Sequence, residues 1–374
     1  MNVLILGGGL IGGPMALDLS QYQDINVSVA DISDKILKRF ESMDNIKTVK
    51  QDFSDTKQLS SLISGHDMVI SAVPGFMGYK TLKTIIEAGK NVVDIAFFPE
   101  DAFGLDSLAK EKNVTAIVDC GVAPGMSNML MGYADYLLDK TETGIIYVGG
   151  LPEERVLPWE YKAVFSPIDV LEEYIRPVFN IENGKLVEKQ ALSEAELIDF
   201  PHIGTLEAFN TDGLRSLVKT LDIPDMKEKT MRYPGYIDKL IFLRENGFFD
   251  DKAVLINGKE IRPIDLTAKL LLPQWELKQG EADLTIMKVQ VSGIKDDKPK
   301  TYTWNLFDKY DHKTEIHSMA RTTGYTATTV LRMLKQGMFD KKGIIPPELI
   351  GREKKCMLFI LDELKKKNIE YKMD

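Results

Sequence analysis

The fold is decided by the stretch Val3-Leu4-Ile5-Leu6-Gly7-Gly8-Gly9-Leu10-Ile11-Gly12. Its apolar start is too short for a helix and leads directly into a Gly-x-Gly-x-x-Gly turn. A helical pattern follows from residue 10 to 19, and a second apolar run, residues 25–30, ends at Asp31. This order of strand, glycine turn, helix, strand and acid predicts a dinucleotide-binding site.

Each residue of this pattern has a physical role. Gly7 permits the tight turn, Gly9 lets the backbone approach a pyrophosphate, and Gly12 lets the helix pack closely on the sheet. The free N–H groups and the positive end of the helix dipole then face the phosphates. Asp31 would accept hydrogen bonds from the ribose hydroxyls and repel a 2′-phosphate, which favours NAD over NADP. Alternatively, Asp31 caps a helix that begins near Ser33.

Composition limits the classes of function. The 374 residues are 44% hydrophobic and 28% charged, which is enough for two well-packed domains. The net charge of −9 argues against a nucleic-acid partner. Only Cys120 and Cys356 are present, and the four histidines have no metal-ligand spacing, so we expect no metal. Without a signal-peptide pattern or a membrane-length apolar run, we expect a cytoplasmic protein that binds no membrane.

Short apolar runs alternate with helical patterns as far as residue 118. The predicted strands are residues 3–6, 27–30, 47–50, 68–72, 91–95 and 114–118, and the predicted helices are 34–42, 56–64, 76–88 and 102–110. This alternation predicts an α/β fold, with a Rossmann-type doubly wound parallel sheet in a domain of residues 1–123.

Ligands of such sheets bind beyond the carboxyl ends of the strands. The cofactor is therefore expected against the residues that follow the predicted strands. These are Gly7, Gly9, Leu10, Ile11, Gly12, Asp31, Ile32, Asp52, Phe53, Val73, Pro74, Asp94 and Pro124.

The pattern changes after Gly125. A helix is predicted over residues 127–138, strands over 144–148, 254–256 and 284–292, and polar turns over 185–190 and 295–300. We expect a second, mixed α/β domain for substrate binding and dimerisation at residues 124–318. A helical segment, residues 319–374, is expected to return to the first domain, with amphipathic helices over 327–335 and 353–367.

Six further motifs carry a resemblance to a known family. They are Asp119-Cys120-Gly121-Val122-Ala123-Pro124-Gly125-Met126-Ser127-Asn128, Gly149-Gly150-Leu151-Pro152, Phe165-Ser166-Pro167, Leu206-Glu207-Ala208-Phe209-Asn210-Thr211-Asp212-Gly213-Leu214, Thr230-Met231-Arg232-Tyr233-Pro234-Gly235 and Met319-Ala320-Arg321-Thr322-Thr323-Gly324-Tyr325. In these stretches the chain resembles the saccharopine dehydrogenase superfamily, and within it the L-lysine 6-dehydrogenase branch.

The resemblance implies an NAD(P)-dependent enzyme that moves hydride to or from a carbon bearing nitrogen. Saccharopine-forming members carry an acid where this chain has Ala123, which favours oxidative deamination of the L-lysine ε-amine to 2-aminoadipate semialdehyde, with NADH and ammonia as the other products. The alternatives are a dehydrogenase of saccharopine or a related amino-acid adduct, and an NAD-binding regulatory protein without turnover. The resemblance also implies a homodimer or higher oligomer.

Oxidation at the ε-carbon requires a neutral nitrogen, and a free lysine amine has a pKa of ~10.4, so a base is needed. The candidate bases are Asp119, Asp94 and His202. Asp119 and Asp94 follow adjacent predicted strands, whereas His202 lies just before the 206–214 motif. Each has a structural alternative, such as a backbone hydrogen bond within the turn for Asp119.

Arg232 is the main candidate for anchoring the substrate. Its planar guanidinium matches an α-carboxylate, and the resemblance places this motif at the substrate carboxylate. A structural ion pair is the alternative. Glu207 and Asp212 are candidates for the α-ammonium group, Arg321 and Thr322 for a second anchor, and Tyr161, with Tyr174 as a further possibility, for the wall of the site. The expected partner is thus L-lysine or a related diamino acid.

Overall fold

The structure is a computed structural model that describes residues 1–163, 170–171, 173–278 and 280–374. It divides into two compact units, which we describe one at a time. Unit 1 contains residues 1–137 and 319–371, and unit 2 contains residues 138–318 and 372–374. The Phe165-Ser166-Pro167 motif lies outside the described residues.

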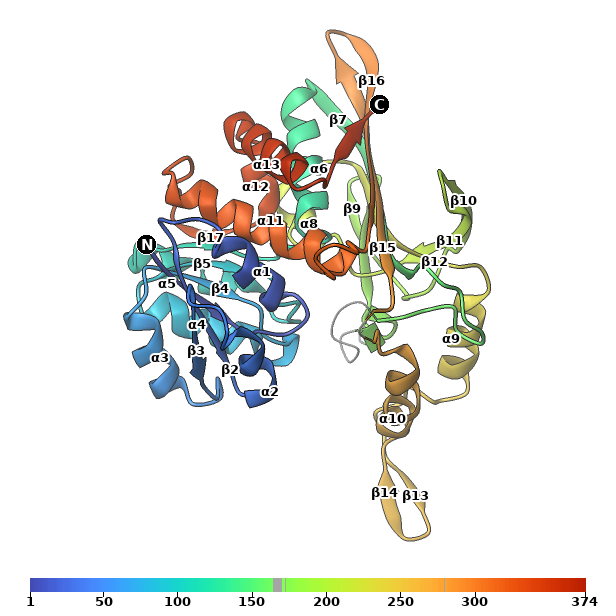
Figure 1. The fold of residues 1–374 in the computed structure, drawn as a ribbon. Helices are drawn as coiled ribbons and strands as arrows, with labels where there is room; N and C mark the ends of the chain where they lie inside the picture. The colour runs from blue at the N-terminus through green and yellow to red at the C-terminus, as the bar shows by residue number, and fades with distance from the viewer. Residues whose placement is uncertain (164–169, 172, 279) are drawn as a thin grey trace. The chain divides into compact units, whose positions relative to one another are not determined.

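Unit 1 is built on a seven-stranded sheet in the order β17-β6-β5-β4-β1-β2-β3 (Figure 1). Every pair of neighbouring strands is parallel. The strands are β1 (Asn2–Leu6), β2 (Asn26–Asp31), β3 (Ile46–Lys50), β4 (Met68–Ser71), β5 (Asn91–Asp94), β6 (Thr115–Ile117) and β17 (Gly343–Ile345). The six strands predicted before residue 118 are all present, and the predicted Rossmann-type fold is confirmed.

Helices connect these strands, as βαβ alternation requires. They are α1 (Gly12–Leu19), α2 (Asp34–Leu37) with the 3-10 turn η1 (Lys38–Phe40), α3 (Thr56–Ser64), α4 (Gly75–Glu87), and the 3-10 turn η2 (Ala102–Leu105) with α5 (Asp106–Glu111). The remaining helices of the unit are α6 (Met126–Leu137), α11 (Ser318–Lys335), α12 (Pro347–Gly351) and α13 (Lys354–Lys366). Helix α3 has the predicted bounds, and its first N–H groups are capped by the Asp55 carboxylate.

The C-terminal segment adds a strand that the sequence analysis did not predict. Strand β17 continues the parallel sheet beside β6, and the Gly343 N–H donates to the Val114 carbonyl at 2.9 Å. The Asp106 carboxylate accepts from the Ile344 N–H at 3.0 Å. Three residues are too few for a periodic signal, so this strand is defined by its neighbours.

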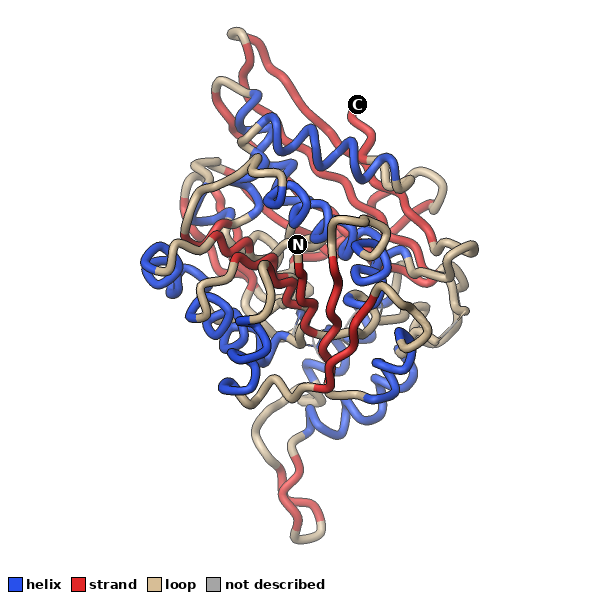
Figure 2. The backbone as a smooth tube through the Cα atoms, turned by 60° about the vertical axis from the view of Figure 1, so that its left-hand side comes forward, coloured by secondary structure: helices blue, strands red, loops and turns tan. Residues whose placement is uncertain are grey.

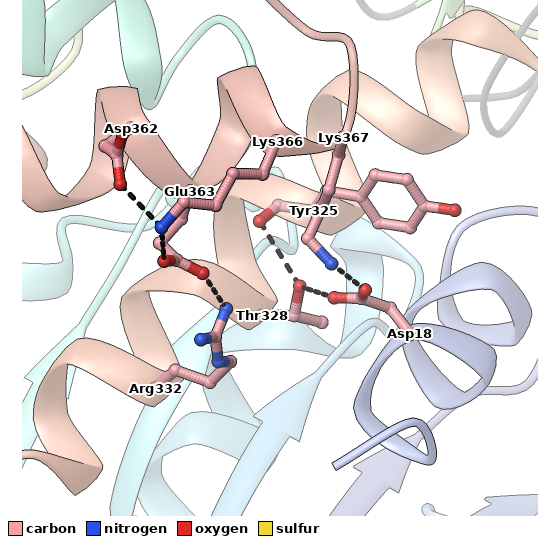
Figure 3. Close-up of polar contacts among 8 residues, drawn as sticks. All are labelled: Asp18, Tyr325, Thr328, Arg332, Asp362, Glu363, Lys366 and Lys367. Atoms are coloured by element: carbon pink, nitrogen blue, oxygen red, sulfur yellow. Dashed lines mark hydrogen bonds and ion pairs between the residues drawn. The ribbon is translucent and has the colours of Figure 1, made fainter.

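A buried ion pair ties the end of α13 to α1, the helix that follows the glycine turn (Figure 3). The Lys367 ammonium contacts the buried Asp18 carboxylate, and the Thr328 hydroxyl of α11 donates to the same carboxylate at 2.5 Å. Arg332 and Glu363 join α11 to α13 at 2.5 Å. Because a buried carboxylate without its cation is strongly destabilising, this contact fixes the C-terminal helices to α1.

Unit 2 contains a nine-stranded mixed sheet with the path β10-β11-β12-β7-β15-β16-β18, from which β8 and β9 branch at β12. Strands β12 and β7 are parallel, whereas β11 with β12, β15 with β7, and β15 with β16 are antiparallel. The strands are β7 (Lys140–Pro152), β8 (Val178–Glu182), β9 (Lys185–Lys189), β10 (Glu196–Phe200), β11 (Gly204–Asn210), β12 (Asp225–Arg232), β15 (Asp283–Lys295), β16 (Lys298–Lys309) and β18 (Tyr371–Met373). The predicted second, mixed α/β architecture is confirmed.

The two predicted polar turns have different outcomes. Residues 185–190 were expected as a turn, but Lys185–Lys189 form β9, so that prediction was wrong. A charged, solvent-exposed edge strand has little apolar content to reveal it. The turn expected at 295–300 is confined to Asp296 and Asp297, both with positive φ, between the long strands β15 and β16.

Helices α8 (Leu217–Thr220), α9 (Tyr236–Glu245) and α10 (Pro263–Trp275) complete the described helices of unit 2. An aromatic cluster that includes Tyr161, Tyr174, Tyr236 and Trp275 forms one of its cores. Among the described strands, β13 (Val254–Ile256) and β14 (Lys259–Ile261) pair only with each other, and their hairpin projects from this unit (Figure 2). Across the described residues, no helix is both long and apolar enough to cross a membrane.

Candidate functional site

The glycine turn of unit 1 has the backbone geometry that the sequence predicted. Gly7 has a φ of +94°, and a Cβ there would lie 2.6 Å from the Ala72 carbonyl oxygen. A Cβ on Gly12 would lie 1.8 Å from the Gly7 carbonyl oxygen. At Gly9, by contrast, a Cβ would meet no atom within 4 Å. Gly7 and Gly12 are therefore required by the fold, whereas Gly9 leaves open space beside the start of α1.

Asp31 ends β2 and holds the glycine turn in place. Its Oδ2 accepts a hydrogen bond from the Gly8 N–H at 2.9 Å, and its Oδ1 accepts from the Ser33 N–H at 2.9 Å. The second bond is local, but it does not cap α2, because the N-cap of that helix is Ser33 and no side chain caps it. The bond to Gly8 spans two strands and gives this carboxylate a role in shaping the turn. Each oxygen keeps a further lone pair, with which a ribose hydroxyl could interact.

The other predicted cofactor residues also follow strands of the parallel sheet. Ile32 and Leu10 are exposed, Ile11 and Phe53 are half-buried, and Val73 is buried. Pro74 is the residue before α4, and Pro124 lies in the loop after β6. Asp52 is exposed, and hydrogen bonding from Ser54 lowers its pKa. Because carboxyl ends of parallel strands share one edge, all of these positions lie at the edge where the sequence predicts the nucleotide, and their contact with it stays a prediction.

Asp94 differs from the other acids at this edge because it is fully buried. Its Oδ1 accepts from the Ala96 N–H at 2.6 Å, while its Oδ2 has no hydrogen-bond partner among the described residues. Burial raises its pKa to about 8, and nearby Asp119 acts in the same direction, whereas the Ala96 N–H and the Ser71 hydroxyl act against it. Asp94 is therefore protonated at neutral pH, and it can exchange a proton near that pH.

Hydrogen bonds hold the loop from Asp119 to Asn128 in shape. Asp119 has a φ of +50°, and the Cys120 N–H donates to the Asp94 carbonyl at 2.9 Å. The Asn128 side-chain oxygen accepts from the Gly125 N–H at 3.2 Å and from the Ser127 hydroxyl at 2.9 Å. The loop thus places Asp119 directly beside Asp94, which brings two of the three candidate bases together.

Arg321 and Thr322 belong to α11 in unit 1. Both are buried. The Arg321 guanidinium donates to the Lys367 carbonyl at 3.1 Å, and the Thr322 hydroxyl donates to the Met319 carbonyl at 3.4 Å. These contacts are of the kind that stabilises the end of a helix, and the substrate role of both residues stays a prediction.

Arg232 ends β12 in unit 2, where it is only 3% exposed. One terminal nitrogen donates to the Met231 carbonyl at 3.0 Å, and the other lies 3.5 Å from the Tyr174 hydroxyl and 3.7 Å from a Glu173 carboxylate oxygen. The guanidinium also lies over the Tyr161 ring, 4.6 Å from its centroid. Its Nε–H has no hydrogen-bond partner among the described residues.

The Nε–H without a described partner bears on the two alternatives for Arg232, a substrate anchor and a structural ion pair. A structural arginine this deeply buried is expected to use all its donors, because a buried donor without an acceptor costs free energy. An edge of the guanidinium that includes Nε can instead bind a carboxylate in the bidentate geometry. The contacts of Arg232 therefore fit the carboxylate anchor that the sequence predicted.

Two of the other predicted substrate residues lie close to Arg232. Glu207 stands opposite Arg232 in the register of β11 and β12, and its Oε2 accepts from the Gly235 N–H at 3.1 Å. Tyr161 stacks on the guanidinium, and burial raises the pKa of this tyrosine, so the ring keeps its proton. Asp212 follows β11 and acts electrostatically on Glu228 of β12.

Glu228 is a buried acid that the sequence analysis missed. Its Oε2 accepts from the Thr211 hydroxyl at 2.6 Å. Burial raises the pKa of Glu228 to about 8, the Thr211 bond and Arg232 lower it, and Glu173 and Asp212 raise it further. The signal was the alternation of Glu228, Thr230 and Arg232, which places all three on one face of a strand.

His202 lies apart from these groups. It is exposed in the turn between β10 and β11, where φ is +70°, and its ring is 5.7 Å from that of Phe307. No contact with Arg232, Glu207 or Glu228 is found for His202 in the described part of the chain. Its role as a base stays a prediction. Likewise, the described residues contain no group of three or more His, Cys, Asp or Glu side chains that could hold a metal ion.

The fold and the glycine turn define the class: a dinucleotide-binding α/β protein with a second, mixed-sheet unit. More specifically, the chain belongs to the saccharopine dehydrogenase family. The model described as saccharopine dehydrogenase NADP binding domain matches residues 3–117, and the saccharopine dehydrogenase C-terminal domain matches residues 121–369. The predicted resemblance is thereby confirmed for the family.

Two relatives and one solved structure show how far the similarity extends. The mitochondrial alpha-aminoadipic semialdehyde synthase of Mus musculus is 28% identical over 72% of this chain and 31% of that protein. The NADP(+), L-glutamate-forming saccharopine dehydrogenase of Schizosaccharomyces pombe is 25% identical over 80% of this chain and 69% of that protein. The apo saccharopine dehydrogenase (L-Glu forming) of Saccharomyces cerevisiae has the same fold, with a TM-score of 0.82 at 19% identity, covering 100% of this chain and 99% of that one.

The first two curated relatives are much longer than this chain, which spans 31% and 35% of their lengths. Their names therefore describe proteins with additional parts. The two domain matches show the family membership of this chain.

Proposed function

We propose that this chain is an NAD(P)-dependent oxidoreductase that oxidises the C–N bond of a lysine-derived amino acid, with an adduct of the saccharopine type as its first candidate substrate. The observation that carries the proposal is the match of both saccharopine dehydrogenase domains, which together extend from residue 3 to residue 369. The glycine turn in unit 1 and the open Nε–H of Arg232 in unit 2 supply groups for a dinucleotide and a carboxylate.

Unit 1 supplies what a dinucleotide requires. The space beside Gly9 and the N–H groups at the start of α1 suit a pyrophosphate. Asp31 stabilises the turn by accepting a hydrogen bond from the Gly8 N–H. A nicotinamide bound there would accept the hydride. Asp94 and Asp119 are the candidate groups to take the proton from the substrate nitrogen. Because the pKa of Asp94 is about 8, this carboxyl group becomes a proton acceptor only as the pH rises through that value.

Unit 2 supplies the contacts for an amino acid. Arg232 would bind a carboxylate through its Nε edge, and Glu207 on the neighbouring strand would receive an ammonium group. Once the C–N bond is oxidised, water adds to the resulting C=N bond and the carbon–nitrogen bond breaks. With saccharopine the departing group is an amino acid, and with L-lysine it is ammonia.

L-Lysine itself is the second candidate, and Ala123 favours it. By the family resemblance, saccharopine-forming members carry an acid at this position. The relatives' names favour the adduct, and Ala123 favours the simpler amine, so both substrates belong in the same experiment. We also propose, on the resemblance, a homodimer.

The test is absorbance at the reduced-nicotinamide band, with purified protein, NAD or NADP, and saccharopine, L-lysine or L-ornithine. We expect reduced nucleotide with saccharopine, and the second candidate predicts it with L-lysine alone. If nucleotide binds but no amine or amino acid reduces it, the proposal fails and a regulatory nucleotide-binding protein remains.

A further inference from the structure

One face of β12 carries three buried polar residues in succession. Glu228, Thr230 and Arg232 are 3%, 6% and 3% exposed. Alternate residues of a strand point to the same side, so the three side chains share one face. Phe209, which is opposite Thr230 in the register of β11 and β12, belongs to the aromatic cluster of unit 2. A sheet face that packs on an aromatic core is normally apolar, so this polar row calls for an explanation.

The hydrogen bonds along this row use one oxygen of Glu228 and leave the Nε–H of Arg232 without a partner among the described residues. Thr211 bridges the row, because its hydroxyl contacts Glu228 at 2.6 Å and Thr230 at 2.8 Å. That bond uses Oε2 of Glu228, and the carboxyl group has Oε1 as its second acceptor. At the other end, the Nε–H of Arg232 has no partner in the described part of the chain. A carboxyl group and a guanidinium thus each keep one position for a ligand.

The spacing of the two ends fits an extended ligand. Four residues along a strand place the Cα atoms of Glu228 and Arg232 ~13 Å apart, and both side chains are long enough to reach toward the middle. The α-carboxylate carbon and the ε-nitrogen of an extended lysine chain are separated by roughly 7 Å, as six carbon–carbon or carbon–nitrogen bonds allow. An α-ammonium group lies too close to its own carboxylate to use this spacing.

We propose that Glu228 binds the distal amine of a lysine-type ligand while Arg232 binds its carboxylate. This face of β12 would then select ligands in which the two groups have the separation found in lysine. The inference rests on the proposed function, and it names the residue that would select substrates with a lysine side chain. Glu207, opposite Arg232, remains the candidate for the α-ammonium group.

The charge of Glu228 adds a second, independent signature. Burial raises the pKa of its carboxyl group to about 8, and the groups around it are Thr211 and Arg232, which lower it, and Glu173 and Asp212, which raise it. A bound ammonium favours the ionised carboxylate, so binding releases a proton from Glu228. Affinity for a distal amine should therefore rise as the pH increases from 6 to 8, while the amine itself stays protonated up to ~10.

Glu228 also has a structural contact that the test must separate from binding. A Cβ on Gly213 would lie 2.3 Å from the Glu228 carboxyl carbon, so the 211–214 turn packs directly on this side chain. Glu228→Gln keeps the shape and an oxygen that can accept from Thr211, and it removes only the charge. Thr211→Val is the matched control, because it removes the hydrogen bond and leaves the carboxyl group in place.

The experiment measures dissociation constants by calorimetry, with whichever reduced nucleotide the chain binds present to prevent turnover. The ligands are L-lysine, 6-aminohexanoate, which lacks the α-amine, and L-norleucine, which lacks the distal amine. We expect Glu228→Gln to weaken L-lysine and 6-aminohexanoate about tenfold or more and to leave L-norleucine unchanged. Arg232→Gln should weaken the binding of all three ligands. Thr211→Val should preserve the difference in affinity between the two ligands that have a distal amine and L-norleucine, which lacks it.

Several results would overturn the assignment. They are equal weakening of all three ligands by Glu228→Gln, no weakening at all, or no detectable binding of 6-aminohexanoate to the unaltered protein. If Glu228→Gln does not fold, the unaltered protein still decides the question: the affinity for 6-aminohexanoate must increase from pH 6 to pH 8, whereas that for L-norleucine must not. Oxidation of saccharopine or L-lysine without this selectivity would retain the proposed function and reject the role of Glu228.

Discussion

The glycine turn of unit 1 and the β11–β12 face of unit 2 build their candidate sites in different ways. In the turn, the groups that would meet a ligand are backbone N–H groups, and side chains matter chiefly where they are absent, as at Gly9. On the β11–β12 face, the groups are buried side chains whose free positions depend on neighbours such as Tyr174 and Thr211. Binding at the glycine turn should therefore be weakened by any added side-chain atom, whereas binding at the β11–β12 face should be weakened by the loss of a charge.

The largest effect is expected from Gly12→Ala, because the added Cβ would lie 1.8 Å from the Gly7 carbonyl oxygen. The backbone must move to relieve this overlap, at a cost of about 1–3 kcal/mol or more in the free energy of unfolding. Nucleotide binding should be lost as well, since the turn and the start of α1 move together. Chemical denaturation and nucleotide titration measure the two effects.

Gly9→Ala is the matched control, since its Cβ would meet no protein atom within 4 Å. The stability of this variant should equal that of the unaltered protein, while its nucleotide affinity falls at least tenfold through overlap with the pyrophosphate. Normal nucleotide binding by Gly9→Ala would show that the space beside this residue is not the phosphate site.

An intermediate effect, on stability, is expected from Asp94→Asn. Asp94 is a side chain at the carboxyl edge of the parallel sheet, where the other candidate contacts come from backbone N–H groups. The folded-state pKa of Asp94 is about 8, above its usual value of 3.8, so the folded protein holds a proton that the unfolded chain releases between these values. This contribution to stability is complete below pH ~4 and is lost as the pH rises toward 8. Asn resembles the protonated acid, so the variant should lose less stability than the unaltered protein between pH 5 and pH 8.

Denaturation midpoints at both pH values measure that difference, and Asp52→Asn is the control. Asp52 is exposed and its pKa is lowered, so its contribution changes only at acid pH. Identical pH slopes for Asp94→Asn and the unaltered protein would mean that Asp94 is ionised at neutral pH, and would remove it as a proton-exchanging group.

The same contrast explains what the sequence could predict. Gly7, Gly9, Gly12 and Asp31 act through local backbone geometry, and their order along the chain was sufficient to predict the sheet and its binding edge. Strand β17 and the role of Glu228 depend on contacts between distant segments, Gly343 with Val114 and Thr211 with Glu228. The charged edge strand β9 was mistaken for a turn because its composition resembles one. Arg232 was predicted from the fit of a guanidinium to a carboxylate together with the family resemblance, since a lone arginine has no periodic signal.

The smallest effect is expected from Asp31→Asn. This substitution separates the hydrogen bonds that Asp31 makes to the backbone of the turn from the effect of its negative charge. The Asp31 carboxylate accepts from the N–H groups of Gly8 and Ser33, and its charge would repel a 2′-phosphate. The family model is named for NADP, whereas this acid favours NAD, so the preference is open to measurement. Asn keeps one acceptor oxygen and removes the charge, and the ratio of NADP to NAD affinity should rise by about tenfold, roughly 1.4 kcal/mol. Asp34→Asn is the control, because this exposed acid pairs with Lys50 at 2.5 Å and should leave the ratio unchanged. An equal ratio in both variants would mean that Asp31 serves only to hold the turn, and that the choice of nucleotide is made elsewhere at this edge.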